Sequence, residues 1–317
     1  MEKTQIYDTK VTDKKIAVVG IGGVGGYLAG MLGRICPHVT LAARGERKKS
    51  LEQNGLILHS EYKGEMTIHP ECVEETKNLK EQDIIFLCVK NYSLADACEE
   101  LQAAVSDHTI IIPVMNGVNP GERVRKFIQR GTVVDSLIYI VAFANEDYSV
   151  TQQGNFARLC IGIKNANDRQ KQKVEEVAAL LAAAGIDFEK TEDIEVEIWR
   201  KYILNCAYNV VTAYYDNTIG QLRKDEQKAK EYEALVKEAE QVALAKGVGI
   251  KKEHIDAIIH RFYYEYADNA TSSLQRDIRA RRKSEADVFS GYIVQEAEKY
   301  NISVPVSKKM YKKLCEK

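Results

Sequence analysis

The sequence lacks the features that would point to a membrane, a metal centre or a disulfide framework. No apolar run approaches the roughly 18 residues that a membrane-spanning helix needs. The seven cysteines are scattered without a C-x-x-C pair, and the six histidines form no H-x-x-x-H pair. We therefore expect neither disulfides nor a metal such as zinc, and interpret the cysteines as buried, reduced thiols of a cytoplasmic protein.

The chain also lacks an excess of charge of either sign. Lysine and arginine number 45 against 46 acidic residues, which leaves a formal net charge of −1. A nucleic-acid partner would need a concentrated basic face, so none is expected. Residues 1–13 are polar and mixed in charge, which argues against a signal peptide or membrane anchor and indicates a tail ahead of the first strand.

What the sequence does contain is a glycine-rich turn between two apolar runs near its start. Ile16–Val19 has the character of a buried parallel strand, and the pattern G-x-G-x-x-G begins at Gly20 directly after it. A small-residue helical segment, Val24–Gly33, and a second apolar run, Val39–Ala42, follow. The order strand, glycine turn, helix, strand is typical of a dinucleotide-binding unit.

Each glycine of this motif has a physical reason. Gly20 permits a tight turn, Gly22 lets a pyrophosphate approach bare backbone, and Gly25 lets the helix pack closely on the strand. The N–H groups and positive end of the helix then favour the anion. The alternative is a glycine turn that serves helix–sheet packing alone.

The end of the second strand indicates which dinucleotide is bound. NAD sites usually place an acidic residue there for the ribose 2′-OH, but this chain has Arg44 and no acid until Glu46. A guanidinium suits a 2′-phosphate, and the run Arg47–Lys49 would add positive charge. We therefore predict NADPH rather than NADH, the alternative being that Arg44 is an ordinary solvated loop residue.

Strand-like runs alternate with helical segments up to about Lys190, and long helical periodicity replaces them afterwards. The later strands include Val133–Ala144 and Ala157–Gly162, with the polar segment Glu146–Asn155 as a turn between them. The first long helix of the second half is Ile194–Tyr215. We expect an α/β fold, with a Rossmann dinucleotide-binding domain over residues 1–190 and an all-α domain over residues 191–317.

Two polar residues follow predicted strands of the first domain. Lys90 comes after Asp83–Val89, and Asn116 comes after Thr109–Met115. Binding sites of parallel sheets lie at the carboxyl ends of strands, so both residues are candidates for the cofactor crevice. Either one is equally compatible with a loop cap or a turn.

The second half carries a polar row on its first helix. Lys201, Asn205 and Asn209 fall at i, i+4 and i+8, which places them on one helix face. Asparagine is a poor mid-helix residue, so two of them in line with a lysine need a reason. A substrate-binding surface is one reason, and an exposed polar face or an interhelical hydrogen-bond ladder is the other.

A second polar cluster comes later, at Thr271, Ser272 and Ser273, followed by Glu285. Any of the three hydroxyl residues is suited to capping the next helix. Glu285 starts a predicted helix, Glu285–Tyr300, and could simply interact with its dipole.

Together these motifs make the chain resemble the 2-dehydropantoate 2-reductase (ketopantoate reductase) family. The matching pieces run in order from Lys14 to Pro305: G-I-G-G-V-G, Arg44, C-V-K-N, M-N-G, W-R-K-Y-I-L-N-C-A-Y-N and T-S-S-L-Q-R-D-I-R-A-R-R-K-S-E. The K-x-x-x-N-x-x-x-N helix with the later serines and glutamate is much more distinctive than the glycine motif.

The resemblance implies a second domain like the C-terminal domain of 6-phosphogluconate dehydrogenase, and a role for each matching residue. Lys201 would be the general acid for the keto oxygen, and Glu285 would contact the substrate hydroxyl. The implied substrate-binding residues are Asn205, Asn209, Ser273 and Asn116. The implied cofactor-binding residues are Gly20, Gly22, Gly23, Val24, Gly25, Arg44, Lys90, Asn116 and Glu285.

The expected reaction is the reduction of 2-dehydropantoate to pantoate by NADPH, a step toward pantothenate and coenzyme A. A paralogue acting on another branched 2-keto acid is the nearest alternative. An NADPH-sensing regulator without catalysis is a second alternative, although it would not need Lys201 or Glu285. A short-chain dehydrogenase is disfavoured because no tyrosine has a lysine four residues on. The expected partner is a small 2-keto acid, and a homodimer is compatible with this interpretation.

Overall fold

The computed structural model describes residues 9–316 and divides into two compact units. The first unit extends to Met115 and continues from Asn119 to Ile194, and the second comprises Asn116–Val118 and Glu195–Lys317. Residues 1–8 of the predicted tail lie outside the described part, and its end forms the short helix α1 (Thr9–Thr12). Within residues 9–316, no helix has the length and apolar character that crossing a bilayer requires.

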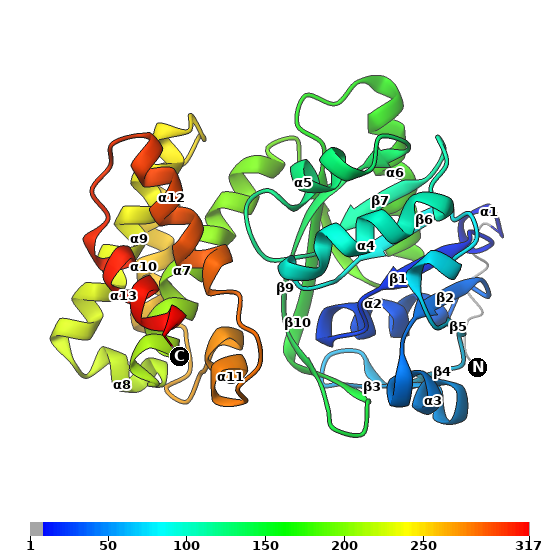
Figure 1. The fold of residues 1–317 in the computed structure, drawn as a ribbon, viewed down its shortest axis with the longest axis horizontal. Helices are drawn as coiled ribbons and strands as arrows, with labels where there is room; N and C mark the ends of the chain where they lie inside the picture. The colour runs from blue at the N-terminus through cyan, green and yellow to red at the C-terminus, as the bar shows by residue number, and fades with distance from the viewer. Residues whose placement is uncertain (1–8, 317) are drawn as a thin grey trace. The chain divides into compact units, whose positions relative to one another are not determined.

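A parallel six-stranded sheet is the centre of the first unit (Figure 1). Its strand order is β5-β2-β1-β6-β7-β8, with β1 and β2 at the predicted positions. Parallel strands covered on both faces are expected to be continuously apolar, and β1 and β6 are buried along their whole length. The strands are β1 (Ile16–Val19), β2 (Val39–Ala42), β5 (Glu71–Val73), β6 (Ile84–Leu87), β7 (Ile110–Pro113) and β8 (Thr132–Val133).

The two faces of this sheet belong to different cores. In β1, Ile16 and Val18 point into one cluster, while Ala17 and Val19 point into the other, as the period of two requires. The cluster containing Ala17 and Val19 is completed by α4 (Leu94–Glu100), the 3-10 turn η3 (Leu101–Ala104) and α5 (Pro120–Phe127). The other cluster is completed by α2 (Gly23–Gly33), α6 (Asp168–Ala183) and a second sheet.

The second sheet has the path β11-β10-β3-β4, with β9 paired antiparallel to β10. It places β3 beside β10, nearly a hundred residues later in the chain, in parallel. Its strands are β3 (Leu56–Ser60), β4 (Gly64–Ile68), β9 (Asp135–Ala144), β10 (Val150–Gly162) and β11 (Asp187–Lys190).

Helix α2 lies between the two sheets because its glycines allow a close approach. A Cβ added at Gly23 would lie 2.3 Å from the Ala142 carbonyl oxygen, and one at Gly26 would lie 2.3 Å from a Val150 methyl group. Gly30 and Gly33 meet Leu58 and Ile68 in the same way. Spacings of three and four residues put these glycines on one helix face, so the small-residue segment is a packing stripe as well as part of the motif.

The predicted turn Glu146–Asn155 was too long. Strand β10 already begins at Val150, so only the first residues of that segment turn the chain. Val150 is fully buried against α2, and the buried Gln152 side chain accepts from Ser60 and donates to the backbone carbonyls of Gln153 and Gly154. Tertiary hydrogen bonds thus make a polar stretch part of a strand, which local composition did not indicate.

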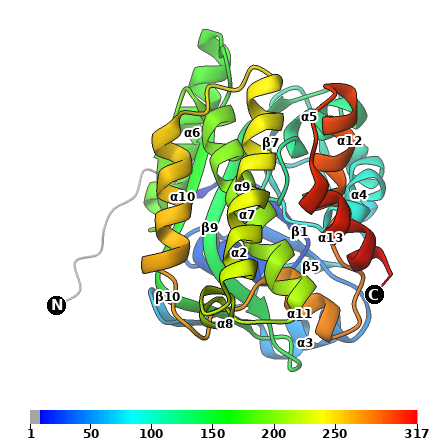
Figure 2. The ribbon, with the colours of Figure 1, turned by 90° about the vertical axis from the view of Figure 1, so that its left-hand side faces the viewer.

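The second unit is helical throughout its described residues, apart from its connecting segments (Figure 2). Helix α7 has the predicted bounds, Ile194–Tyr215. Helix α8 was not predicted because it has only five residues, whereas α11 begins at the hydroxyl residues that were expected to cap a helix. The other helices are α8 (Ile219–Arg223), α9 (Glu226–Ala245), α10 (Lys252–Tyr264), α11 (Ser273–Arg279), the π-helical turn η4 (Asp287–Gly291), α12 (Tyr292–Lys299) and α13 (Pro305–Cys315).

Helix α9 is the centre of this helical core. It packs against α8, α10, α12 and α13, and Figure 2 shows it between α10 and α13. Tyr232 of α9 stacks on Phe262 of α10 with ring centroids 4.0 Å apart. The buried carboxylate of Glu238 accepts from the backbone N–H groups of Val306 (2.9 Å) and Ser307 (2.8 Å), which ties α9 to the first turn of α13.

Candidate functional site

The glycine turn has the geometry expected for a dinucleotide site. Gly20 adopts φ +93°, and an added Cβ there would lie 2.7 Å from the backbone of Cys88. A Cβ at Gly25 would lie only 2.0 Å from the Gly20 carbonyl oxygen. Gly22, by contrast, has open space where its Cβ would be. Two of the three motif glycines are therefore needed for packing, and the third leaves room beside the backbone at the N-terminus of α2.

The end of β2 carries an arginine that is already paired. Arg44 caps α3 (Gly45–Asn54), and its Nη2 donates to both carboxylate oxygens of Glu100 at 3.0 and 3.2 Å. The Arg44 side chain remains 63% exposed. The residues present fit a 2′-phosphate because an exposed guanidinium stands where NAD sites have an acid, but Glu100 competes for it.

The neighbouring basic residues do not form the predicted positive patch. Lys48 pairs with Glu52 and Lys49 pairs with Glu46, so acidic side chains offset both charges. Arg47 turns onto the ring of Tyr148 in the β9–β10 turn, 5.7 Å from its centroid. Burial lowers the pKa of Arg47, and among described residues its Nε and Nη2 have no hydrogen-bond partner. The prediction of a positive patch rested on the number of basic residues in the run. The electrostatic potential there also depends on the acidic side chains that pair with them, which the structure shows.

Lys90 and Asn116 occupy the predicted positions after adjacent parallel strands. Lys90 follows β6 and precedes the 3-10 turn η2 (Asn91–Ser93), and Asn116 follows β7. Arg123, a residue that sequence reasoning missed, braces the first of these loops by donating to the Asn91 side chain (2.8 Å) and backbone carbonyl (3.1 Å). Asn116 groups with the helical unit, where Val118 packs on the core.

The polar row of α7 forms the first half of a hydrogen-bonded cluster. Asn209 is 5% exposed, and its Nδ2 donates to Asn205 Oδ1 at 3.4 Å. The Asn209 Oδ1 in turn accepts from Ser273 Oγ (3.1 Å) and from the Leu274 N–H (3.4 Å). Lys201, two turns before Asn209 on the same face, is half-buried. The structure thus brings Asn205, Asn209 and Ser273 together across 64 residues of sequence.

The three hydroxyl residues of the second cluster, Thr271–Ser273, make different contacts. Ser272 caps α11, since its Oγ accepts from the Gln275 N–H at 3.1 Å, and it also accepts from Thr212 at 2.7 Å. Ser273 is not part of the cap and faces Asn209 instead. Thr271 contributes its carbonyl oxygen, which accepts from Tyr208 Oη at 3.2 Å.

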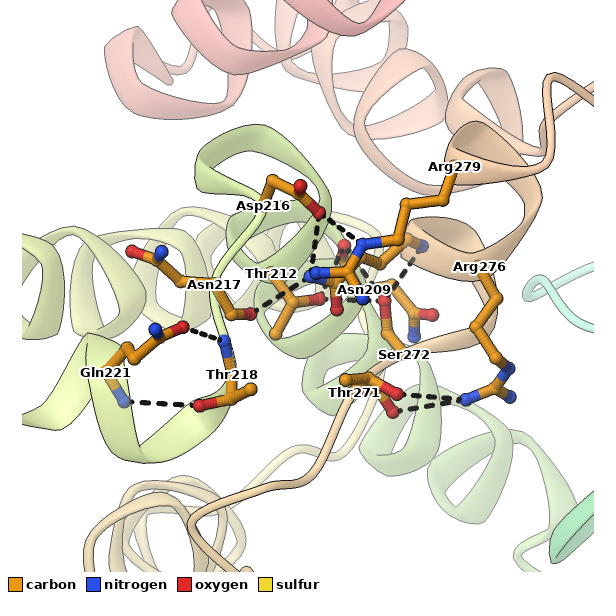
Figure 3. A network of polar contacts seen from close by, with 11 residues as sticks. Asn209, Thr212, Asp216, Asn217, Thr218, Gln221, Thr271, Ser272, Arg276 and Arg279 are labelled. Carbon is orange, nitrogen blue, oxygen red and sulfur yellow. Dashed lines mark hydrogen bonds and ion pairs between the residues drawn. The ribbon is translucent and has the colours of Figure 1, made fainter.

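Residues beyond α7 hold α11 in place, and sequence reasoning missed them (Figure 3). Asp216 has a left-handed φ of +54° just after α7, and its carboxylate accepts from Arg279 Nε at 2.7 Å and Gln275 Nε2 at 3.1 Å. The Asn217 carbonyl oxygen accepts from the same Gln275 amide at 3.3 Å. These contacts fix the position of α11 along its axis relative to the end of α7, and they thereby fix the position of Ser273.

Glu285 lies just before η4, a turn that is hydrogen-bonded to α7. It is 5% exposed and lies two residues before the start of η4, and its carbonyl oxygen accepts from the Val288 N–H at 2.9 Å. The hydroxyl of Tyr202, next to Lys201, donates to the carbonyl oxygens of Val288 (2.7 Å) and Phe289 (2.8 Å). A π-helical turn breaks the regular hydrogen-bond ladder and is frequent at functional sites. Here a neighbour of Lys201 anchors it.

All seven cysteines are free. Cys36, Cys98, Cys160 and Cys206 are buried, and burial raises the pKa of Cys36 and of Cys98 to about 11. Cys315 is exposed, which differs from the expectation of buried thiols because it ends the last helix. None of the described residues forms a cluster of three or more groups able to hold a metal ion.

A Rossmann-like unit with an open glycine turn, followed by a helical domain, is an architecture of NAD(P)-dependent oxidoreductases. Residues 16–165 match the family "Ketopantoate reductase PanE/ApbA", and residues 193–317 match "Ketopantoate reductase PanE/ApbA C terminal". The two matches cover most of the chain in order, so the chain belongs to the ketopantoate reductase family.

Relatives agree with this assignment along their full length. The chain is 26% identical to the uncharacterized oxidoreductase YkpB of Bacillus subtilis (strain 168), over 95% of this chain and 97% of the relative. It is also 26% identical to a 2-dehydropantoate 2-reductase of Pyrococcus horikoshii, over 92% and 94%.

Solved structures share the fold. A PanE/ApbA family ketopantoate reductase from Ralstonia eutropha JMP134 superposes with a TM-score of 0.86 at 24% identity, covering 95% of this chain and 97% of that one. D-mandelate dehydrogenase in a ternary structure with NADH and anilino(oxo)acetate has a TM-score of 0.85 at 20% identity, with the same coverage. A dimeric ketopantoate reductase from Staphylococcus aureus has a TM-score of 0.79 at 23% identity, covering 95% and 97%.

Proposed function

We propose that this chain reduces 2-dehydropantoate to pantoate with NADPH, using Lys201 as the general acid. The hydrogen-bonded cluster of Asn205, Asn209 and Ser273, in line with Lys201 on α7, is the observation that carries the proposal. It gathers neutral donors from two distant segments beside a cation, which suits a small, polar, anionic substrate. An exposed polar face would not need Asn209 to be buried. The bonds to Ser273 and Leu274 are those of an interhelical ladder, and the half-buried Lys201 on the same face favours a substrate-binding role beyond it.

The proposed roles follow from the charge that develops during reduction. When bound, NADPH supplies a hydride for the keto carbon, and negative charge grows on the keto oxygen. The Lys201 ammonium stabilises this charge and donates a proton to the oxygen. Asn205, Asn209 and Ser273 position the substrate through hydrogen bonds without adding charge. Glu285 contacts the substrate hydroxyl and the cofactor, and orients Lys201.

The cofactor side has its own proposed residues. The first turn of α2, with Gly20, Gly22, Gly23, Val24 and Gly25, would hold the pyrophosphate through backbone N–H groups. Arg44 would bind the 2′-phosphate once it leaves Glu100. Lys90 and Asn116 would lie beside the cofactor at the carboxyl ends of β6 and β7, and Asn116 would also contact the substrate.

The test is a substrate panel with both cofactors. Oxidation of NADPH should be fastest with 2-dehydropantoate and slower with unbranched and aromatic 2-keto acids. With NADH in place of NADPH, the reduction of 2-dehydropantoate should be slower still. An aromatic 2-keto acid belongs in the panel because of the fold shared with D-mandelate dehydrogenase. A preference for another 2-keto acid would identify a paralogue, and cofactor binding without turnover of any acid would identify a regulator. Sedimentation of the same sample tests whether the chain forms the expected homodimer. Cell fractionation tests whether the protein is in the cytoplasm, as expected.

Lys201→Ala should lower kcat by about 10²-fold or more, because the proton donor and the stabilising charge are both removed. Lys230→Ala is the matched control, since Lys230 is an exposed lysine of α9 paired with Glu226. Turnover of Lys201→Ala equal to that of the control would remove Lys201 from the acid role.

A further inference from the structure

Arg276 differs from Arg279 and Arg282 in having no ion pair with an acidic side chain among the described residues. Its Nη1 donates to the carbonyl oxygen and to the hydroxyl of Thr271, both at 3.4 Å, and it makes no ion pair within residues 9–316. Arg279, one turn later, is paired with Asp216, and Arg282 lies 3.8 Å from Asp277. Figure 3 shows the Arg276 guanidinium at the edge of the network, reached only by Thr271.

Arg276 lies next to the proposed substrate-binding residue Ser273. Arg276 is three residues after Ser273 on α11, so the two side chains lie on neighbouring positions of one helix face. Thr271, which Arg276 contacts, also accepts a hydrogen bond from Tyr208, the residue directly before Asn209. The guanidinium is thus tied to the same two segments that join Asn209 to Ser273.

The environment of Arg276 makes an unpaired cation costly. Its side chain is only partly exposed, and burial lowers the pKa of Arg276 although the group stays charged at neutral pH. Two long hydrogen bonds to neutral oxygens, and the nearby Asp277 carboxylate that makes no ion pair with it, offset only part of this desolvation. A buried or half-buried arginine normally has a carboxylate or phosphate partner, which a planar fork of N–H groups holds in a bidentate manner.

We infer that Arg276 binds the carboxylate of the 2-keto acid and so selects acids over neutral ketones. This inference rests on the proposed function and deepens it. Lys201 is then committed to the keto oxygen, while Arg276 neutralises the carboxylate near Ser273. A charge-assisted bond of this kind contributes about 1.5–3 kcal/mol, or about 10- to 100-fold in affinity.

The experiment measures equilibrium binding to the full chain saturated with NADP⁺, so that it does not depend on turnover. Calorimetry would compare pantoate, lactate and mandelate with their neutral primary amides. In Arg276→Gln the Kd of the acids should rise about 10-fold or more, while the Kd of the amides stays the same. Arg276→Lys should be intermediate because it keeps the charge without the fork. Arg282→Gln, at a largely exposed arginine just after the same helix, should leave the acids within about twofold of wild type.

Three outcomes would overturn the inference: equal acid affinity in wild type and Arg276→Gln, a parallel loss for acids and amides, or a wild-type chain that binds none of the three acids. A parallel loss would mean that Arg276 only braces Thr271. The turnover assay reports on the proposed function separately. Acid-selective binding through Arg276 without reduction of any 2-keto acid would sink the proposed reaction and leave this inference standing.

Discussion

The motif glycines Gly22 and Gly25 should respond to alanine in opposite ways. Gly25→Ala would place a Cβ 2.0 Å from the Gly20 carbonyl oxygen and 3.1 Å from the Cys88 Cβ. Gly22→Ala would place a Cβ in open space, at a residue with an ordinary negative φ of −90°. The first change perturbs the fold, whereas the second occupies the room that we assign to the cofactor.

The magnitudes follow from these distances. Overpacking costs about 1–3 kcal/mol, and Gly25→Ala should reach the upper end because the obstacle is a backbone oxygen. For a unit of this size about 3 kcal/mol lowers Tm by roughly 6–12 °C. Gly22 caps α2, where alanine is less favourable than glycine, but a less flexible unfolded chain offsets part of that loss. The net change should stay within about 1 kcal/mol, while the Kd for NADPH should rise about 10-fold or more.

Thermal unfolding and NADPH titration of the two variants provide the assay. Gly249→Ala is the control, since its Cβ would make only an ordinary 3.6 Å contact with Val196 in the helical unit. The reasoning is refuted if Gly22→Ala binds NADPH as tightly as wild type. It is equally refuted if Gly25→Ala unfolds at the wild-type temperature.

Three further predictions concern charged side chains. Arg44→Ala should raise the KM for NADPH far more than for NADH, and Glu100→Gln should lower the Kd for NADPH by up to about fivefold by releasing Arg44 from a surface ion pair. Glu238→Ala should destabilise the chain by about 2–4 kcal/mol because one buried and one part-buried N–H group of α13 lose their acceptor. Burial opposes ionisation of Glu231, but hydrogen bonds from Lys309 and Tyr215 lower its pKa. Its stabilising effect is therefore present above the unfolded-state value of about 4.3 and is lost as the pH falls through the lower folded-state pKa, so Glu231→Gln should flatten the acid limb of the Tm–pH curve.

Each of these has a clear contrary result. Equal effects of Arg44→Ala on both cofactors would show that Arg44 ignores the 2′-phosphate. Stability of Glu238→Ala equal to that of the exposed neighbour variant Lys237→Ala would show that water replaces the carboxylate. Parallel acid limbs for wild type and Glu231→Gln would mean that Glu231 titrates alike in the folded and unfolded chains.

Local pattern determined much of this protein. The bounds of β1, β2 and α7 follow from apolar runs and helical periodicity, because each is set by residues that are neighbours in sequence. The glycine turn and the row Lys201–Asn205–Asn209 were visible for the same reason, since fixed spacings put side chains on one face.

Only the tertiary structure decided which polar groups meet. Ser272 and Ser273 are adjacent and chemically identical, yet one caps α11 and the other faces Asn209, because α11 docks against the end of α7. Arg44 and Glu100 pair across 56 residues, and the early start of β10 depends on its pairing with β3. Contacts of this kind depend on how distant segments pack, and no spacing along the chain records that.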